Sequence, residues 1–176
     1  MNILITLKQK DLDAVSAQQL LANYGPSSIE ITTIQRYENY EISGSYNQQL
    51  LLKHIENSHV FANPNKHHLI QNLTNFNNDQ LIFNVSRKSP LNLESKVSVL
   101  NQLLGNNSIT SVTMSELWSI SFSKKILDQN ELMSTILTSS SNNSAPFAHP
   151  LIHNVDILSL QELSQKLQLP TTSVSA

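Results

Sequence analysis

The sequence has no cysteine and only three glycines among its 176 residues. The absence of cysteine excludes a disulfide framework, a thiolate metal site and a thiol nucleophile. The scarcity of glycine excludes a phosphate-binding loop of the dinucleotide-binding or P-loop type, because these loops need several glycines at fixed spacing. The composition therefore points away from an enzyme that uses nucleotides on its own.

Charged residues are also sparse. They make up 14% of the chain, and the formal net charge is −2. Such a chain has no basic field that would attract nucleic acid and no polybasic segment for an anionic membrane. The apolar segment 1–7 is too short for a signal peptide, and no apolar run is long enough to cross a bilayer. We expect a cytoplasmic protein that binds neither nucleic acid nor membrane.

A short motif occurs twice, as Phe61-Ala62-Asn63-Pro64 and as Phe147-Ala148-His149-Pro150, each followed by a histidine three residues after the proline. The patterns that precede the two motifs also recur, which predicts two copies of one unit of about 80 residues. The expected organisation is a first repeat at 1–70, a polar linker at 71–80, a second repeat at 81–158 and a C-terminal tail at 159–176.

Hydrophobic periodicity predicts the order β-α-β-β-α-β in each repeat. In the first repeat we expect strands at 2–7, 29–34, 37–42 and 67–70, and helices at 12–24 and 47–60. In the second we expect strands at 81–85, 109–114, 117–122 and 155–158, and helices near 93–104 and after Asp128. A turn at Gln35-Arg36 or Glu38-Asn39 is expected between the middle strands of the first repeat. The tail is expected to carry one more helix, at 160–167.

A single repeat would have a small core and open sheet edges, so the two copies are expected to pack on each other. Their covalent connection makes this association intramolecular. The predicted fold class is α+β, with two tandem β-α-β-β-α-β repeats whose antiparallel sheets pack as an intrachain pseudo-dimer.

We find no pattern typical of a catalytic or metal site. Histidines 54, 59, 67 and 68 lack metal-ligand spacing with an acidic partner, and Pro150 prevents one helix from carrying both His149 and His153. Asp11 and Asp13 stand where helix caps stand. The strand aromatics Tyr37, Tyr40, Trp118 and Phe122 are expected in the core, because the basic-aromatic motif of RNA-binding sheets is missing. We expect no catalytic residue, no metal and no cofactor.

Taken in order, these features resemble the PurS family, the small subunit of phosphoribosylformylglycinamidine synthase. The resemblance is carried by the helix entries Leu12-Asp13 and Leu91-Asn92, by a glycine at the end of each first helix, and by the two Phe-Ala-x-Pro motifs. The structural signature consists of Phe61, Asn63, Pro64, Phe147, His149, Pro150, Gly25 and Gly105. The Gly-Lys pair common in the family before the third strand is absent, and Arg36-Tyr37-Glu38 and Glu116-Leu117-Trp118 stand there instead.

The resemblance implies a non-catalytic subunit in purine biosynthesis. It would bridge a PurQ-like glutaminase subunit, which releases ammonia, and a PurL-like synthetase subunit, which uses ATP to form a C–N bond. Lys8, Arg36 and Arg87 are the residues expected to contact these partners, and further homo-oligomerisation is left open. A similar pseudo-dimer forms the N-terminal domain of the long form of the enzyme. The alternative hypothesis is an ACT-like regulatory module that binds a small metabolite between the repeats.

Overall fold

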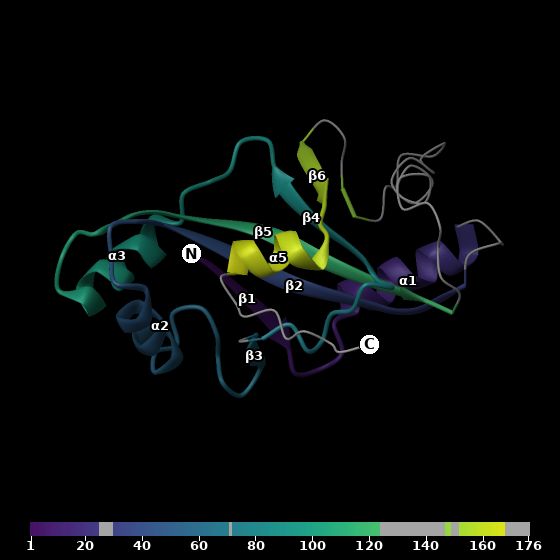
Figure 1. Cartoon of the computed structure of the whole chain (residues 1–176), viewed down its shortest axis with the longest axis horizontal. Helices are drawn as coiled ribbons and strands as arrows, with labels where there is room; N and C mark the ends of the chain where they lie inside the picture. The colour runs from purple at the N-terminus through teal and green to yellow at the C-terminus, as the bar shows by residue number, and fades with distance from the viewer. Residues whose placement is uncertain (25–29, 71, 124–146, 149–151, 168–176) are drawn as a thin grey trace.

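A computed structural model describes residues 1–24, 30–70, 72–123, 147–148 and 152–167 (Figure 1). This part of the chain forms an α+β fold with one six-stranded antiparallel sheet, in the order β3-β1-β2-β5-β4-β6, and four helices. The strands are β1 (Asn2–Leu7), β2 (Ile31–Gly44), β3 (His67–Ile70), β4 (Leu81–Arg87), β5 (Ile109–Phe122) and β6 (His153–Ile157). The helices are α1 (Leu12–Tyr24), α2 (Gln48–Glu56), α3 (Glu94–Leu104) and α5 (Leu160–Leu167).

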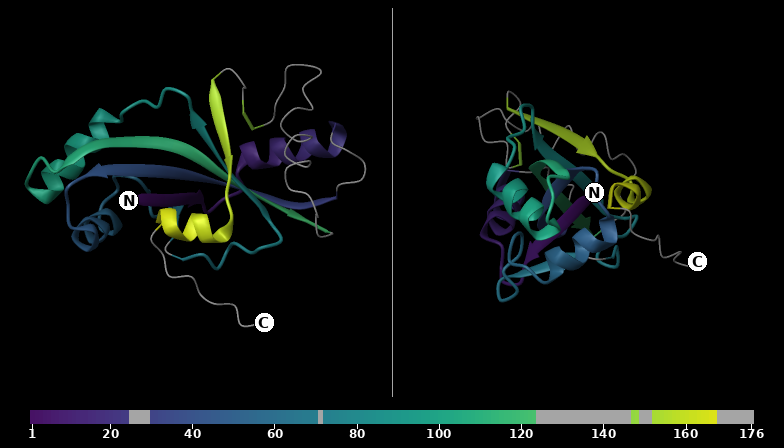
Figure 2. Two further views of the ribbon diagram at one scale, coloured as in Figure 1. Left: turned by 45° about the horizontal axis from the view of Figure 1, so that its top comes forward. Right: turned by 90° about the vertical axis from the view of Figure 1, so that its left-hand side faces the viewer.

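The two central strands run most of the length of the molecule (Figure 2). β2 and β5 have 14 residues each and pair from Ile31↔Phe122 to Gly44↔Ile109. The prediction of two strands in each of these regions, with a turn between the two in the first repeat, was therefore wrong, and the first half reads β-α-β-α-β. Neither glycine nor proline interrupts the segments 31–43 and 109–122. Their polar residues lie on both faces of the sheet, because neighbouring residues of a strand point to opposite faces.

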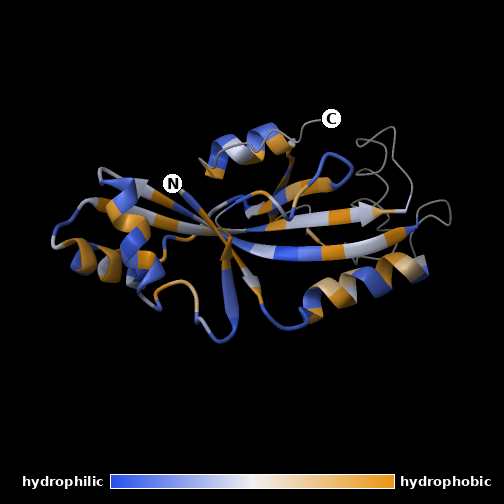
Figure 3. Cartoon of the chain, turned by 60° about the horizontal axis from the view of Figure 1, so that its bottom comes forward, coloured by the Kyte–Doolittle hydropathy of each residue, from blue (hydrophilic) through white to orange (hydrophobic). Residues whose placement is uncertain are grey.

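One face of the sheet is covered by α1 at one end and by α2 and α3 at the other (Figures 2 and 3). Two apolar clusters lie beneath these helices. The first joins Leu21 of α1 to Phe83 of β4 and Trp118 of β5. The second joins Leu100 of α3 to Ile3 of β1 and to other residues of the first half. Each cluster therefore combines elements from both halves of the sequence, so that the two halves bury each other.

The opposite face is covered by α5, which Figure 3 shows on the other side of the sheet from α1. Leu163 and Leu167 of α5 pack in one cluster with Tyr37 and Leu117 of the central strands. Leu73 and Phe76, from the segment expected to be a polar linker, are buried in the same cluster. The predicted helix at 160–167 is confirmed. Its place in the core was not foreseen.

Buried amides lie on the same sheet face as this third cluster, the one with α5. The Asn39 side-chain amide donates to Ser115 Oγ (3.0 Å) and, more weakly, to Asn84 Oδ1 (3.4 Å). The Ser115 hydroxyl donates to Asn84 Oδ1 at 2.9 Å. Asn39 and Asn84 are each less than 10% exposed. These bonds link β2, β5 and β4 and offset the cost of removing the amides from water.

Three helix ends show common capping arrangements. The Asp11 carboxylate accepts hydrogen bonds from the backbone amides of Asp13 and Ala14, which confirms it as the cap of α1. Gly105 ends α3 in the left-handed conformation, at φ 68°, as predicted. At α5 the Glu162 amide donates to the Ser159 hydroxyl, and the Ser159 amide donates to the Glu162 carboxylate, which is a capping box.

Several predictions concern residues outside the described ranges. They are the helix end at Gly25-Pro26, the helix after Asp128, and His149 and Pro150 of the second motif. None of the described helices is long and apolar enough to span a bilayer.

Candidate functional site

The two Phe-Ala-x-Pro motifs place their phenylalanines in the core. The Phe61 ring lies 4.8 Å from the Tyr40 ring on β2. The Phe147 ring lies 4.8 Å from the Trp118 ring on β5, and 5.2 Å from Phe83. Each motif therefore anchors its segment to one of the two long strands, and neither phenylalanine is available to a partner.

The rest of the first motif forms a turn. The Asn63 carbonyl accepts from the backbone amides of Lys66 and His67, and the Asn63 amide donates to His67 Nδ1 at 3.0 Å. The Lys8 ammonium donates to the Pro64 carbonyl at the surface. Lys8, expected at a partner interface, thus ties the end of β1 to the turn.

A polar centre lies between the two apolar clusters, on the face of the sheet that carries α1, α2 and α3. Six residues form it: Asp11, Asp13, Arg36, Glu38, Lys96 and Glu116. At its middle, Glu38 of β2 and Glu116 of β5 are directly paired across the central ladder. Two carboxylates opposite each other repel, so each needs a compensating partner.

Arg36 compensates Glu116. Its Nη1 lies 3.0 Å from Glu116 Oε1, its Nε 2.9 Å from Asp11 Oδ2, and its Nη2 2.9 Å from Asp13 Oδ2. The Arg36 side chain is 16% exposed. Burial by itself would lower the pKa of Arg36, but the hydrogen bond to Asp11 and the three carboxylate charges outweigh it and raise that pKa. Arg36, the second expected partner contact, is therefore engaged within the chain.

Tyr40 and Lys96 compensate Glu38. The Tyr40 hydroxyl donates to Glu38 Oε2 at 2.8 Å. Burial, then this hydrogen bond and the charge of Glu38, raise the pKa of Tyr40. The Lys96 ammonium of α3 donates to the Val60 carbonyl at 2.6 Å and lies 5.0 Å from the Tyr40 ring and 4.7 Å from the Phe61 ring. Burial lowers the pKa of Lys96, although the charge of Glu38 acts in the opposite direction.

Among the described residues, the cavity that adjoins the polar centre is small. A cavity of about 10 Å³ touches Asp11, Arg36, Glu38 and His67, and this volume is at the lower limit for a single water molecule. The cavity touches Glu38 but not Glu116, and its volume leaves no room in it for a substrate. The charged residues of the polar centre are arranged as an ionic link between α1, α3 and the long strands, which fits a structural role better than acid–base catalysis.

A larger pocket lies elsewhere. It has a volume of about 390 Å³ and lies between α2, β1, β3 and the last residue of α5. Ile3, Leu52, Leu69, Ile70 and Leu167 give it apolar walls. No sequence motif indicated it, because its walls come from four separate elements.

The remaining predicted residues are dispersed. Arg87, the third expected partner contact, is exposed at the end of β4, where it is paired with His153 of β6. Gly105 ends α3 at the surface, and no atom lies within 4 Å of the position that a Cβ would take there. In the described ranges, no three residues of the metal-binding types converge on one point.

Comparison of the sequence with models of known protein families gives no match. Comparison with curated proteins gives no similar sequence. The resemblance to the PurS family therefore stays a prediction that rests on the sequence motifs.

Proposed function

We propose that the chain is a non-catalytic, PurS-like bridging subunit of a phosphoribosylformylglycinamidine synthase, built from two tandem repeats that pack as an intrachain pseudo-dimer. In this role it holds a glutaminase subunit and an ATP-using synthetase subunit in register, so that ammonia passes between them without escaping to water. The chain supplies surface, and its partners supply the chemistry.

The strand order carries the proposal. The strand order in the sheet is β3-β1-β2-β5-β4-β6. Outward from β2 come the first and last strands of the first half, β1 and β3, and outward from β5 come the first and last strands of the second half, β4 and β6. A twofold axis through the Glu38↔Glu116 pair would exchange Tyr40 with Trp118. These are the two aromatic rings on which Phe61 and Phe147 pack. Motifs that are related in sequence thus lie on related positions of the sheet, as a duplicated unit requires.

The exposed end of β4 is the part of the predicted interface that remains open to a partner. Lys8 and Arg36 are bound within the chain, whereas Arg87 is exposed. A long cationic side chain on a strand end can pair with a carboxylate of a partner, and its loss then weakens association. We therefore assign the contact to Arg87 in preference to the other two.

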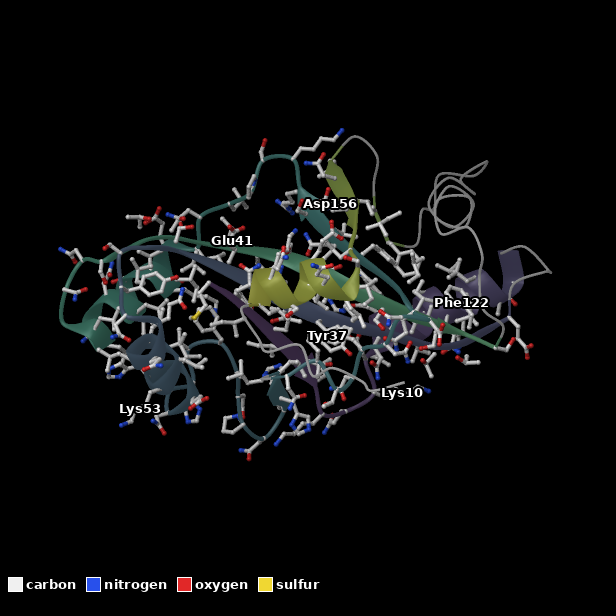
Figure 4. All side chains as sticks on the ribbon, in the orientation of Figure 1. Lys10, Tyr37, Glu41, Lys53, Phe122 and Asp156 are labelled. Atoms are coloured by element: carbon white, nitrogen blue, oxygen red, sulfur yellow. The ribbon has the colours of Figure 1, made fainter. Side chains whose placement is uncertain are left out.

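Reconstitution tests the function. The chain is mixed with the glutaminase and synthetase subunits from the same genome, and complex formation and glutamine-dependent amidine synthesis are measured. We expect a three-component complex, and synthesis that falls when the chain is omitted. Arg87→Glu should weaken the complex, whereas Lys53→Glu, on the exposed side of α2 (Figure 4), should not. Synthesis that is unchanged without the chain would overturn the proposal.

A further inference from the structure

The 390 Å³ pocket beside α2 has the size of a small-molecule site, since such sites usually occupy about 300–1,000 Å³. Its floor is formed by β1 and β3, where Ile3 and Leu69 present apolar side chains. Leu167, at the end of α5, closes one side. The pocket therefore depends on α5 being packed against the first half of the chain.

The face of α2 that lines the pocket carries a polar, an apolar and an acidic side chain in turn. Gln48, Leu52 and Glu56 are four residues apart and so share one face of the helix, and all three line the pocket. A rise of 1.5 Å per residue separates Gln48 from Glu56 by about 12 Å. The pocket thus has a polar group at each end and an apolar middle.

The two ends favour opposite charges. Glu56 has the one charged side chain among the lining residues, and it stands at the C-terminal end of α2, where the helix dipole is negative. Met1 also lines the pocket, and its N-terminal ammonium donates to the Ile42 carbonyl and the Tyr46 hydroxyl. Gln48 and Gln49 line the other end with carboxamides, which can donate hydrogen bonds, in the first turn, where the helix dipole is positive. A cationic group fits beside Glu56, and a carboxylate or carbonyl group fits beside the two glutamines.

We propose that this pocket binds a linear amphipathic small molecule, with an ammonium group at one end, a carboxylate or amide at the other, and an aliphatic chain between them. The ammonium pairs with Glu56, the aliphatic chain packs on Leu52 and Leu69, and the acceptor end meets Gln48 and Gln49. Because Leu167 is part of the wall, bound ligand holds α5 in place. The pocket belongs to the first half and α5, so it differs from a metabolite site between the two halves. It also does not depend on the bridging function.

Three linear probes test the assignment on the full chain. The methyl resonances of Leu52, Leu69 and Leu167 are followed by NMR during titration with ω-aminooctanoic acid, octylamine and octanoic acid. We expect all three methyl groups to shift, and the two-headed probe to bind at least tenfold more tightly than either single-headed probe. Hydrogen exchange of the α5 amides should slow in its presence. Octanoic acid binding as tightly as ω-aminooctanoic acid, or an absence of shifts with all three probes, would refute the proposal.

Matched variants locate the site. Leu52→Trp fills the pocket and should abolish the shifts at Leu69 and Leu167. Leu50→Trp is the matched control. Leu50 is on the same helix, its side chain is 47% exposed and it does not line the pocket, so this variant should leave binding unchanged. Glu56→Gln changes an exposed side chain, so it tests the charge even if Leu52→Trp fails to fold. It should remove the advantage of the two-headed probe over octanoic acid. An unchanged advantage in Glu56→Gln would overturn the charge assignment.

Discussion

Replacement of Phe61 by alanine would test the junction that joins the two halves of the molecule. The ring is 6% exposed and contacts Tyr40 of β2 and Lys96 of α3. Truncation of a buried phenylalanine to alanine costs about 3–5 kcal/mol of stability, through lost burial and the cavity that remains. We expect Phe61→Ala to lower the free energy of unfolding by this amount.

A second substitution separates the aromatic contacts from simple burial. Phe61→Leu keeps an apolar side chain but removes the ring pair with Tyr40, worth about 0.5–1.5 kcal/mol. It also removes the cation–π contact with Lys96, worth about 0.5–1 kcal/mol. We expect Phe61→Leu to cost about 1–2.5 kcal/mol, which is clearly less than the alanine variant.

Urea unfolding provides the measurement. Fluorescence of Trp118, the single tryptophan of the sequence, reports the cluster beneath α1, and far-ultraviolet circular dichroism reports the whole chain. Coincident transitions would indicate that the two clusters unfold together. Leu12→Ala is the control, because Leu12 is 73% exposed and its truncation should change stability by less than about 0.5 kcal/mol. A loss below about 1 kcal/mol for Phe61→Ala would refute the role assigned to the ring.

Further predictions concern single positions. Gly105→Ala should cost about 1–2 kcal/mol, because its φ of 68° strains a residue with a Cβ, and Gly105→Asn should cost less; chemical denaturation would compare them. Burial raises the pKa of Tyr37 from 10.0 to about 12, so the folded protein should lose stability as the pH rises through this interval, and Tyr37→Phe should reduce that loss in unfolding curves measured at alkaline pH. Arg36→Met leaves Asp11 and Glu116 without their cation and should cost about 1.5–3 kcal/mol by thermal unfolding. Leu163→Ala should cost about 2–5 kcal/mol and speed hydrogen exchange in α5, since Leu163 is 2% exposed against the second sheet face.

Elements with strong local signals could be predicted from the sequence. The bounds expected for α1, β1, β3 and α5 are those observed, because alternation, helical periodicity and capping residues mark them locally. The α+β class and the antiparallel pairing were also predicted correctly. The single strand β2 was not, because the adjacent polar residues Gln35-Arg36 and Glu38-Asn39 were interpreted as a turn when they lie within one strand.

Contacts between distant segments could not be predicted in the same way. Arg36 was expected at an interface with a partner, but its carboxylate partner Glu116 lies on a strand far along the chain. The helix at 160–167 was predicted, but the sequence did not indicate which surface it would cover. The spacing of Gln48, Leu52 and Glu56 does not indicate a pocket by itself, because the opposite walls come from β1, β3 and Leu167 of α5.

The pairing of β2 with β5 has a consequence for synthesis on the ribosome. Glu38 and Glu116 are direct neighbours in the sheet, yet they are 78 positions apart (116 − 38). At a translation rate of about 5–20 residues per second, β2 leaves the ribosome about 4–16 s before its partner strand does. During this interval a 14-residue edge of the nascent chain is uncovered, and exposed edges template intermolecular pairing. Chaperone capture should therefore concentrate on nascent chains that end between these two strands.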